Sequence, residues 1–197
     1  MLNVGIILGS TRPNRNGEAV AKWVFEQTKS RTDARYELVD IKDYDLPLLD
    51  EPIPPSQGKY SQPHTKRWAE KIASLDAFVF VTPEYNYAPP PALVNALNYL
   101  SREWNYAPVG FVSYGGISGG LRSVQVAKQI VTTLKMMPIP EGVPMPMVFQ
   151  NLDENGKLKP LDIYRTSAAT MLDELLRWTE ALKSLRADRK TKMKAAA

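Results

Sequence analysis

The sequence of 197 residues contains no cysteine and only one histidine, His64. The absence of thiols excludes disulfides, zinc–thiolate sites, iron–sulfur clusters and thiol redox chemistry. With one histidine and no cysteine, the sequence gives little support to Ser-His-Asp or Cys-His catalysis, and we expect His64 to be a solvated or helix-capping residue. The carboxylates are scattered without the spacing of a metal site, so we predict no bound metal.

Long apolar runs are also missing, since none approaches the roughly 20 residues of a membrane span. The sequence opens directly on a strand-like run, and we expect a cytoplasmic protein without a secretory leader. The net charge of +4 is concentrated in residues 183–197, which hold six Lys or Arg and one Asp, so the remainder carries −1. We therefore expect no nucleic-acid partner, one domain at 1–186 and a disordered basic tail at 187–197.

Five apolar runs predict buried strands at 2–8, 36–41, 77–82, 109–114 and 136–149. They lack strict alternation, as is typical of a parallel sheet covered on both faces, and the fifth is weakest because of its prolines. Helical patterns separate and follow them at 17–30, 61–75, 90–104, 120–135 and 167–186. This order predicts an α/β fold, a doubly wound five-stranded parallel sheet with helices on both faces. Ligands of such sheets bind beyond the carboxyl ends of the strands.

The loop after the first predicted strand, GSTRPNRNG, has the composition of an anion site. Backbone amides and the start of the next helix can form a nest for an anion. Ser10 offers a hydroxyl, while Arg12 and Arg15 offer charge and forked donors suited to phosphate oxygens. Asn16 and Gly17 complete the loop, which matches neither a Walker A sequence nor GxGxxG and therefore fits a phosphate monoester better. The alternative is an ordinary turn with surface arginines.

Two further loops follow the third and fourth predicted strands. In TPEYNYAPPP, Tyr85 and Tyr87 could flank a flat ring and Asn86 could hydrogen-bond its polar edge. A proline-stiffened loop whose tyrosines pack at a subunit contact explains that loop equally well. In SYGGISGGLR, four glycines let a ligand approach exposed backbone amides, and the alternative is a flexible turn.

GSTR at 9–12, PEYN at 83–86 and GG at 115–116 together resemble the NAD(P)H-dependent FMN reductases of the flavodoxin-like fold. This resemblance covers residues 2 to about 182, and the family includes quinone, chromate and azo-dye reductases. The resemblance implies that Ser10 and Arg12 bind the FMN phosphate. It places along the isoalloxazine Pro83, Glu84, Tyr85 and Asn86, and at its pyrimidine side Gly115, Gly116 and Ser118. Many members have Ser and Asn in place of Arg15 and Gly17, so we expect mostly backbone phosphate contacts at 15–17.

The resemblance implies an FMN-dependent enzyme that passes two electrons from NADPH or NADH to a small acceptor. A quinone, an azo dye, a metal oxyanion or free flavin would each fit such a role. FMN would carry the chemistry, so we name no catalytic side chain. Relatives assemble as dimers or tetramers, and we expect a homodimer or homotetramer. The alternatives are a flavodoxin-like electron carrier and a phosphate-ligand binding protein without turnover.

Overall fold

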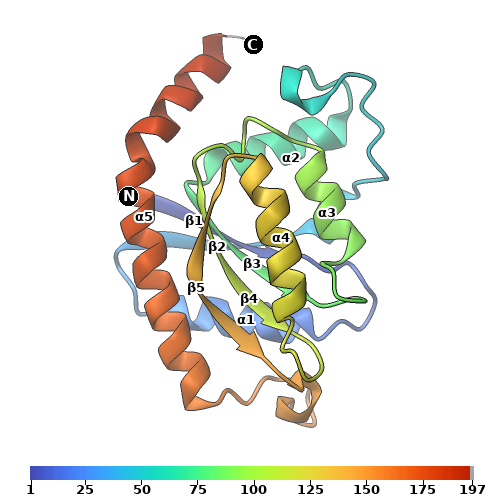
Figure 1. The fold of residues 1–197 in the computed structure, drawn as a ribbon, viewed down its shortest axis with the longest axis vertical. Helices are drawn as coiled ribbons and strands as arrows, with labels where there is room; N and C mark the ends of the chain where they lie inside the picture. Colours follow the sequence, from blue (N-terminus) through green and yellow to red (C-terminus); the bar gives the residue numbers. More distant parts are fainter. Residues whose placement is uncertain (196–197) are drawn as a thin grey trace.

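A five-stranded parallel sheet forms the centre of the structure, a computed structural model that describes residues 1–195 and the side chains as far as residue 188 (Figure 1). The strands are β1 (Leu2–Leu8), β2 (Ala34–Asp40), β3 (Ala77–Pro83), β4 (Pro108–Tyr114) and β5 (Met137–Met145). They lie in the order β2-β1-β3-β4-β5 and all pair in parallel. The predicted doubly wound sheet is confirmed, with the strand limits within a few residues of the predicted ones.

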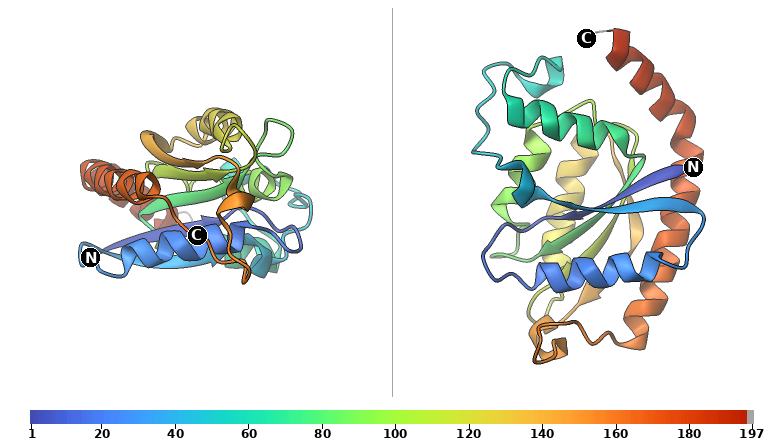
Figure 2. Two further views of the ribbon diagram at one scale, coloured as in Figure 1. Left: turned by 90° about the horizontal axis from the view of Figure 1, so that it is seen from below. Right: turned by 180° about the vertical axis from the view of Figure 1, so that it is seen from behind.

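Helices cover both faces of this sheet, as Figure 2 shows. Helices α1 (Gly17–Thr28) and α5 (Asp162–Ala195) pack on one face, and the other face carries α2 (Pro63–Ser74), α3 (Pro91–Asn98) and α4 (Leu121–Thr133). Short 3-10 helices lie at Ile41–Tyr44, Pro55–Gln57 and Val148–Asn151. Each face buries its own apolar cluster, and Trp68 and Trp104 are buried packing residues of the second.

The strand with the weakest signal, β5, spans nine residues although it contains Pro138, Pro140 and Pro144. It lies at the edge of the sheet and, within the described residues, pairs with β4 alone. An edge strand needs backbone donors on one side only, so prolines can occupy the other positions. Pairing with β4 shifts register between Val109 and Phe111, which shows where the ladder accommodates this irregular strand.

Two helices differ from the predicted limits. Helix α3 ends at Asn98, and the chain continues in turns that still bury Tyr99 and Trp104. Helix α5 begins at Asp162 and extends to Ala195, through most of the segment for which we expected disorder. No Gly or Pro interrupts residues 162–195, and good helix formers dominate them. Residues 196–197 lie outside the described residues, and the assignment of 1–186 as one domain stays a prediction.

Arg186, which is buried, fixes the C-terminal part of α5 to the end of the sheet where β3 and β4 begin. Its guanidinium donates to the backbone carbonyls of Leu75, Glu103 and Asn105. These contacts attach α5 to the rest of the protein at a point beyond Leu175, the last buried residue that the helix contributes to the apolar cluster.

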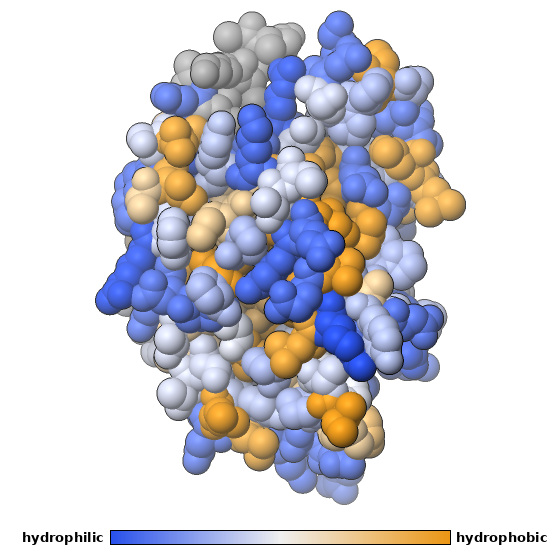
Figure 3. Space-filling model, in the orientation of Figure 1, coloured by the Kyte–Doolittle hydropathy of each residue, from blue (hydrophilic) through white to orange (hydrophobic). Residues whose placement is uncertain are grey.

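The surface in Figure 3 shows apolar side chains in separate patches among hydrophilic ones. Within residues 1–195, no helix is both long and apolar enough to cross a membrane.

Candidate functional site

Three loops meet at the carboxyl ends of β1, β3 and β4, which are neighbours in the sheet. They comprise residues 9–16, 84–90 and 115–120. Backbone hydrogen bonds hold their starting points together, from Gly9 N to Val81 O at 3.0 Å and from Glu84 N to Tyr114 O at 3.2 Å. The structure therefore brings the three predicted loops to one edge of the sheet.

The first loop presents hydrogen-bond donors that the protein does not use. Among the described residues, no protein acceptor receives the backbone N–H groups of Thr11, Asn14, Arg15 and Asn16. The Arg12 side chain is exposed and has no ion-pair partner within the described part of the chain. Helix α1 begins directly afterwards, so its positive dipole end faces the same loop. This donor set suits an anion.

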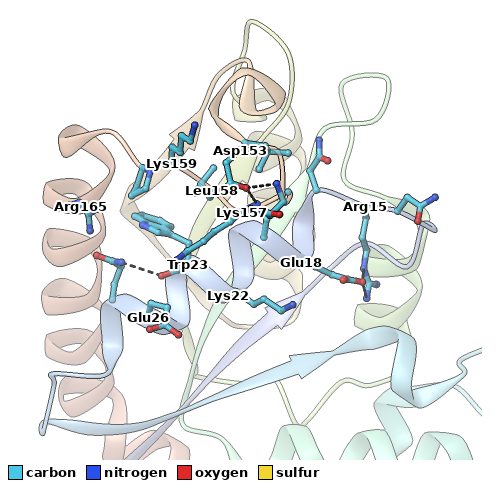
Figure 4. A pocket seen from close by; sticks show the side chains of 18 residues that line it. Arg15, Glu18, Lys22, Trp23, Glu26, Asp153, Lys157, Leu158, Lys159 and Arg165 are labelled. Atoms are coloured by element: carbon cyan, nitrogen blue, oxygen red, sulfur yellow. Dashed lines mark hydrogen bonds and ion pairs between the residues drawn. The ribbon is translucent and has the colours of Figure 1, made fainter.

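The guanidinium of Arg15, in contrast, is committed to the protein. Arg15 is buried and donates to the Ser10 carbonyl, to Asp40 at the end of β2 and, at 3.2 Å, to Glu18. Figure 4 shows the Arg15 and Glu18 side chains next to each other. The side chain thus fixes the shape of the loop, and only its backbone N–H remains for a ligand. A phosphate contact of Arg15, Asn16 or Gly17 stays a prediction.

Side-chain contacts link the three loops. Ser10 Oγ lies 2.8 Å from the Tyr85 hydroxyl and joins the first loop to the second. Glu84 joins the second loop to the third, since its carboxylate accepts from Ser118 Oγ at 2.8 Å and Arg122 Nε at 2.6 Å. Burial opposes the effect, but the hydrogen bonds from Arg122 and Ser118 keep the pKa of Glu84 below its ordinary value. Glu84 is therefore an ionised clamp between two loops.

The second loop is a tight turn. Tyr85 and Ala88 exchange two backbone hydrogen bonds of 2.9 and 3.0 Å, and Asn86 and Tyr87 between them adopt positive φ angles of 51° and 71°. The exposed Tyr87 ring lies under the Arg122 guanidinium, 4.0 Å from its carbon to the ring centroid. The clamp on Glu84 and this cation–π contact thus use the same arginine.

The third loop depends on glycine where it turns into α4. Gly120 has a φ of 83°, and a Cβ there would lie 2.8 Å from Ser113 Cβ and Tyr114 N. Gly115 N donates to Met145 O at 3.4 Å, whereas Gly116 N donates to no protein acceptor among the described residues. A Cβ on Gly116 would meet nothing within 4 Å. Gly116 therefore offers an open position and a free amide.

A hydroxyl that the sequence analysis did not single out lies beneath the first loop. Tyr114, the last residue of β4, is buried, and its hydroxyl has no hydrogen-bond partner in the described part of the protein. Burial raises the pKa of this phenol; Tyr85 adds to the effect, and the charges of Arg15 and Arg12 oppose it. The phenol is therefore protonated at neutral pH. Its position at the end of a strand next to the glycine loop was the available sequence signal.

A groove with a volume of about 1140 Å³ adjoins the first loop at Asn14–Asn16 and extends between α1 and residues 152–160 (Figure 4). None of its lining residues comes from the second or third loop, so it is separate from the place where the three loops meet. His64 lies in the first turn of α2, and its Nε2 is hydrogen-bonded to Asp50 Oδ1 at 3.0 Å. It belongs neither to the three loops nor to the groove. The part of the chain that the structure describes contains no group of three or more His, Asp or Glu arranged for a metal.

The residues present fit FMN. Free amides and an unpaired arginine at a helix start are suited to a terminal phosphate. An open glycine with a free amide, in a loop linked to the first by way of Glu84 and Tyr85, is suited to the polar edge of a flat ring. A single phosphate group accounts for these donors, so none of these observations requires a ligand with a second phosphate.

Known proteins agree with this assignment. The family model of NADPH-dependent FMN reductases matches residues 2–150. The chain is 46% identical over 137 residues to the NAD(P)H-dependent FMN reductase C4B3.06c of Schizosaccharomyces pombe, with 68% of each chain covered. It is 29% identical over 186 residues to a quinone reductase of Pseudomonas putida, covering 90% of this chain and 95% of that one.

The fold is also found among solved structures. The flavoenzyme FerB, an NAD(P)H:acceptor oxidoreductase from Paracoccus denitrificans, superposes with a TM-score of 0.72 at 18% identity, covering 92% of this chain and 98% of FerB. At that identity the likeness concerns the fold, which confirms the flavodoxin-like architecture. With the family match over residues 2–150, it follows that this chain belongs to the NADPH-dependent FMN reductase family.

Proposed function

We propose that this chain holds FMN where its three loops meet and uses it to pass two electrons from NADPH or NADH to a small acceptor. One observation carries the proposal: the free amides of Thr11, Asn14, Arg15 and Asn16 and the unpaired Arg12 side chain lie in a loop tied through Tyr85 and Glu84 to the other two. A phosphate group and a ring joined to it would meet both parts of this arrangement.

The phosphate would be held mainly by backbone and by one side chain. The free N–H groups of the first loop, those of Thr11, Asn14, Arg15 and Asn16, and the start of α1 favour a dianion. The Arg12 side chain adds a charge-assisted hydrogen bond. Ser10 is buried and already bonded to Tyr85, so its role would be to place the second loop against the first. Arg15 would act in the same way, through Asp40.

The ring would lie against residues 83–86 and 115–118. Glu84 and Ser118 would fix the distance between these two loops, because their side chains bond each other. The free Gly116 amide and the start of α4 favour negative charge at whichever polar edge lies beside them. When bound, FMN supplies the hydride chemistry, so the protein needs no side-chain acid or base.

The same proposal covers the oligomeric state of the protein and its location in the cell. Tyr87 and Ile117, 64% and 87% exposed, lie in the second and third loops and give a second copy of the chain apolar contacts. We propose a homodimer or homotetramer in the cytoplasm, where reduced nicotinamides are available. Analytical ultracentrifugation of the FMN-loaded protein, followed at the flavin absorbance, tests the assembly, and a monomer with bound FMN would contradict it.

Anaerobic spectroscopy tests the activity. The protein loaded with FMN is mixed with NADPH or NADH, and the flavin absorbance near the visible maximum is followed. We expect bleaching within the mixing time and recovery of the absorbance when a quinone is added. A flavin that only a partner reductase can bleach would indicate an electron carrier. No uptake of FMN at millimolar concentration would overturn the proposal and leave a phosphate-ligand binding protein.

A further inference from the structure

We propose that the Tyr114 hydroxyl is a further ligand of the bound phosphate and donates a hydrogen bond to it from beneath the first loop. This inference rests on the proposed function, since it assigns a residue to the same site. Neither the motif GSTR nor the motif PEYN contains this tyrosine, which comes from the end of β4.

The position of the hydroxyl supports this assignment. The Tyr114 side chain crosses the sheet face that α1 covers, and it belongs to the apolar cluster that includes Leu8 and Val20. Its hydroxyl ends against Gly17, the first residue of α1, where a Cβ would overlap the Tyr114 oxygen and lie 2.8 Å from Leu8 Cδ1. The oxygen is therefore at the helix start to which the free amides of the first loop lead.

Gly17 makes this approach possible. Any side chain at position 17 would occupy the space that the phenol oxygen uses. The helix therefore has no side chain at position 17, and the Tyr114 hydroxyl, which comes from the sheet, occupies that space. A phenylalanine at 114 would fill nearly the same volume, so packing alone does not account for the oxygen.

The unpaired state of the hydroxyl gives the chemical reason. The Tyr114 oxygen is buried and has no partner among the described residues, and a buried polar group without a partner is costly. Tyr85, Arg15 and Arg12 all lie close enough to act on it electrostatically, and Ser10 takes the Tyr85 hydroxyl. An anion at the helix start would provide the missing acceptor.

The test replaces Tyr114 with phenylalanine and measures two ligands, FMN and riboflavin, which differ only in the phosphate. Apoprotein is titrated with each flavin by fluorescence quenching. We expect the Kd for FMN to rise about tenfold or more, as for a hydrogen bond to a charged group, while the Kd for riboflavin changes less than about twofold. The melting temperature of the apoprotein should stay the same or rise, because the substitution removes an unsatisfied hydroxyl.

Tyr164→Phe is the matched control. Tyr164 lies on α5, is 4% exposed in the same apolar cluster and packs against Trp23 of α1. Neither flavin should lose affinity when the Tyr164 hydroxyl is removed. Gly17→Ala is a second perturbation, since its methyl group displaces the Tyr114 oxygen, and it should also weaken FMN more than riboflavin.

Two results would overturn the assignment while leaving the proposed function intact. One is a Tyr114→Phe protein that binds FMN as the wild type does. The other is an equal loss of affinity for FMN and for riboflavin, which would mean that the phenol only shapes the site. A wild-type protein that binds no FMN would remove the proposed function itself and this inference with it.

Discussion

Replacing Arg12 with alanine should weaken the binding of FMN and leave the stability of the protein unchanged. Arg12 is exposed and unpaired within the described residues, so its removal leaves no buried group without a partner. In the proposed complex it makes a charge-assisted hydrogen bond to phosphate, which is worth about 1.5–3 kcal/mol. The Kd for FMN should therefore rise by roughly tenfold to 150-fold, and riboflavin should bind as before.

Arg15→Ala in the same loop should give the opposite pattern. Arg15 is buried, and its removal breaks the ion pair with Asp40, which keeps only the Lys42 N–H as a donor, and takes the guanidinium away from the Ser10 carbonyl. Breaking a pair of this kind costs about 3 kcal/mol. For a chain of this length, that loss lowers the melting temperature by roughly 6–12 °C. Both flavins should lose affinity together, because the loop itself is altered.

The assay compares the two variants with the wild type by flavin fluorescence quenching and by thermal unfolding of the apoprotein. Raising the salt concentration should shrink the Arg12 effect, since the guanidinium is exposed. The reasoning is refuted if Arg12→Ala lowers the melting temperature while both flavins weaken equally. It is also refuted if Arg15→Ala leaves the melting temperature unchanged and weakens only FMN.

Three further outcomes are expected. Glu84→Gln should weaken flavin binding and lower the melting temperature at neutral pH, because the clamp to Ser118 loses its charge. The folded pKa of Glu84 lies below its ordinary 4.5, so its contribution is present above pH 4.5 and is lost as the pH falls through the folded value. The melting curves of wild type and Glu84→Gln should therefore converge in acid, and a constant difference would argue against the clamp. Gly119→Ala should destabilise the apoprotein, since φ is 60° and a Cβ would lie 2.9 Å from Pro146 N. Gly116→Ala, at an open position, should leave the apoprotein melting temperature within about 1–2 °C, and the opposite ranking of the two glycines would contradict the loop geometry.

Much of the fold followed from local patterns. Apolar runs without alternation predicted β1, β3 and β4 nearly to the residue, because strands buried on both faces leave little room for polar side chains. Pairing partners are a property of the whole chain, and the sequence analysis left the order of the strands open. The length of α5 was underestimated, because the charge of the last residues suggested a tail although nothing in their sequence breaks a helix.

The site was predicted at the level of loops and less well at the level of side chains. The three loops do meet, since parallel strands end at the same edge. What each side chain contacts depends on partners from distant parts of the chain. Asp40 takes the guanidinium of Arg15, and nothing near position 15 indicates that ion pair. The contact of Tyr114 with Gly17 was missed for the same reason, because it exists only when the end of β4 packs against the start of α1.

Helix α5 has a consequence for the synthesis of this protein. Its buried residues between Tyr164 and Leu175 complete the apolar cluster on the sheet face that α1 shares, and they come from the last fifth of the chain. A nascent chain leaves the ribosome from its N-terminus, so this face of β3 and β4 stays uncovered until translation is nearly complete. A transcript truncated after β5 would encode every residue of the three loops and still yield a product prone to aggregate.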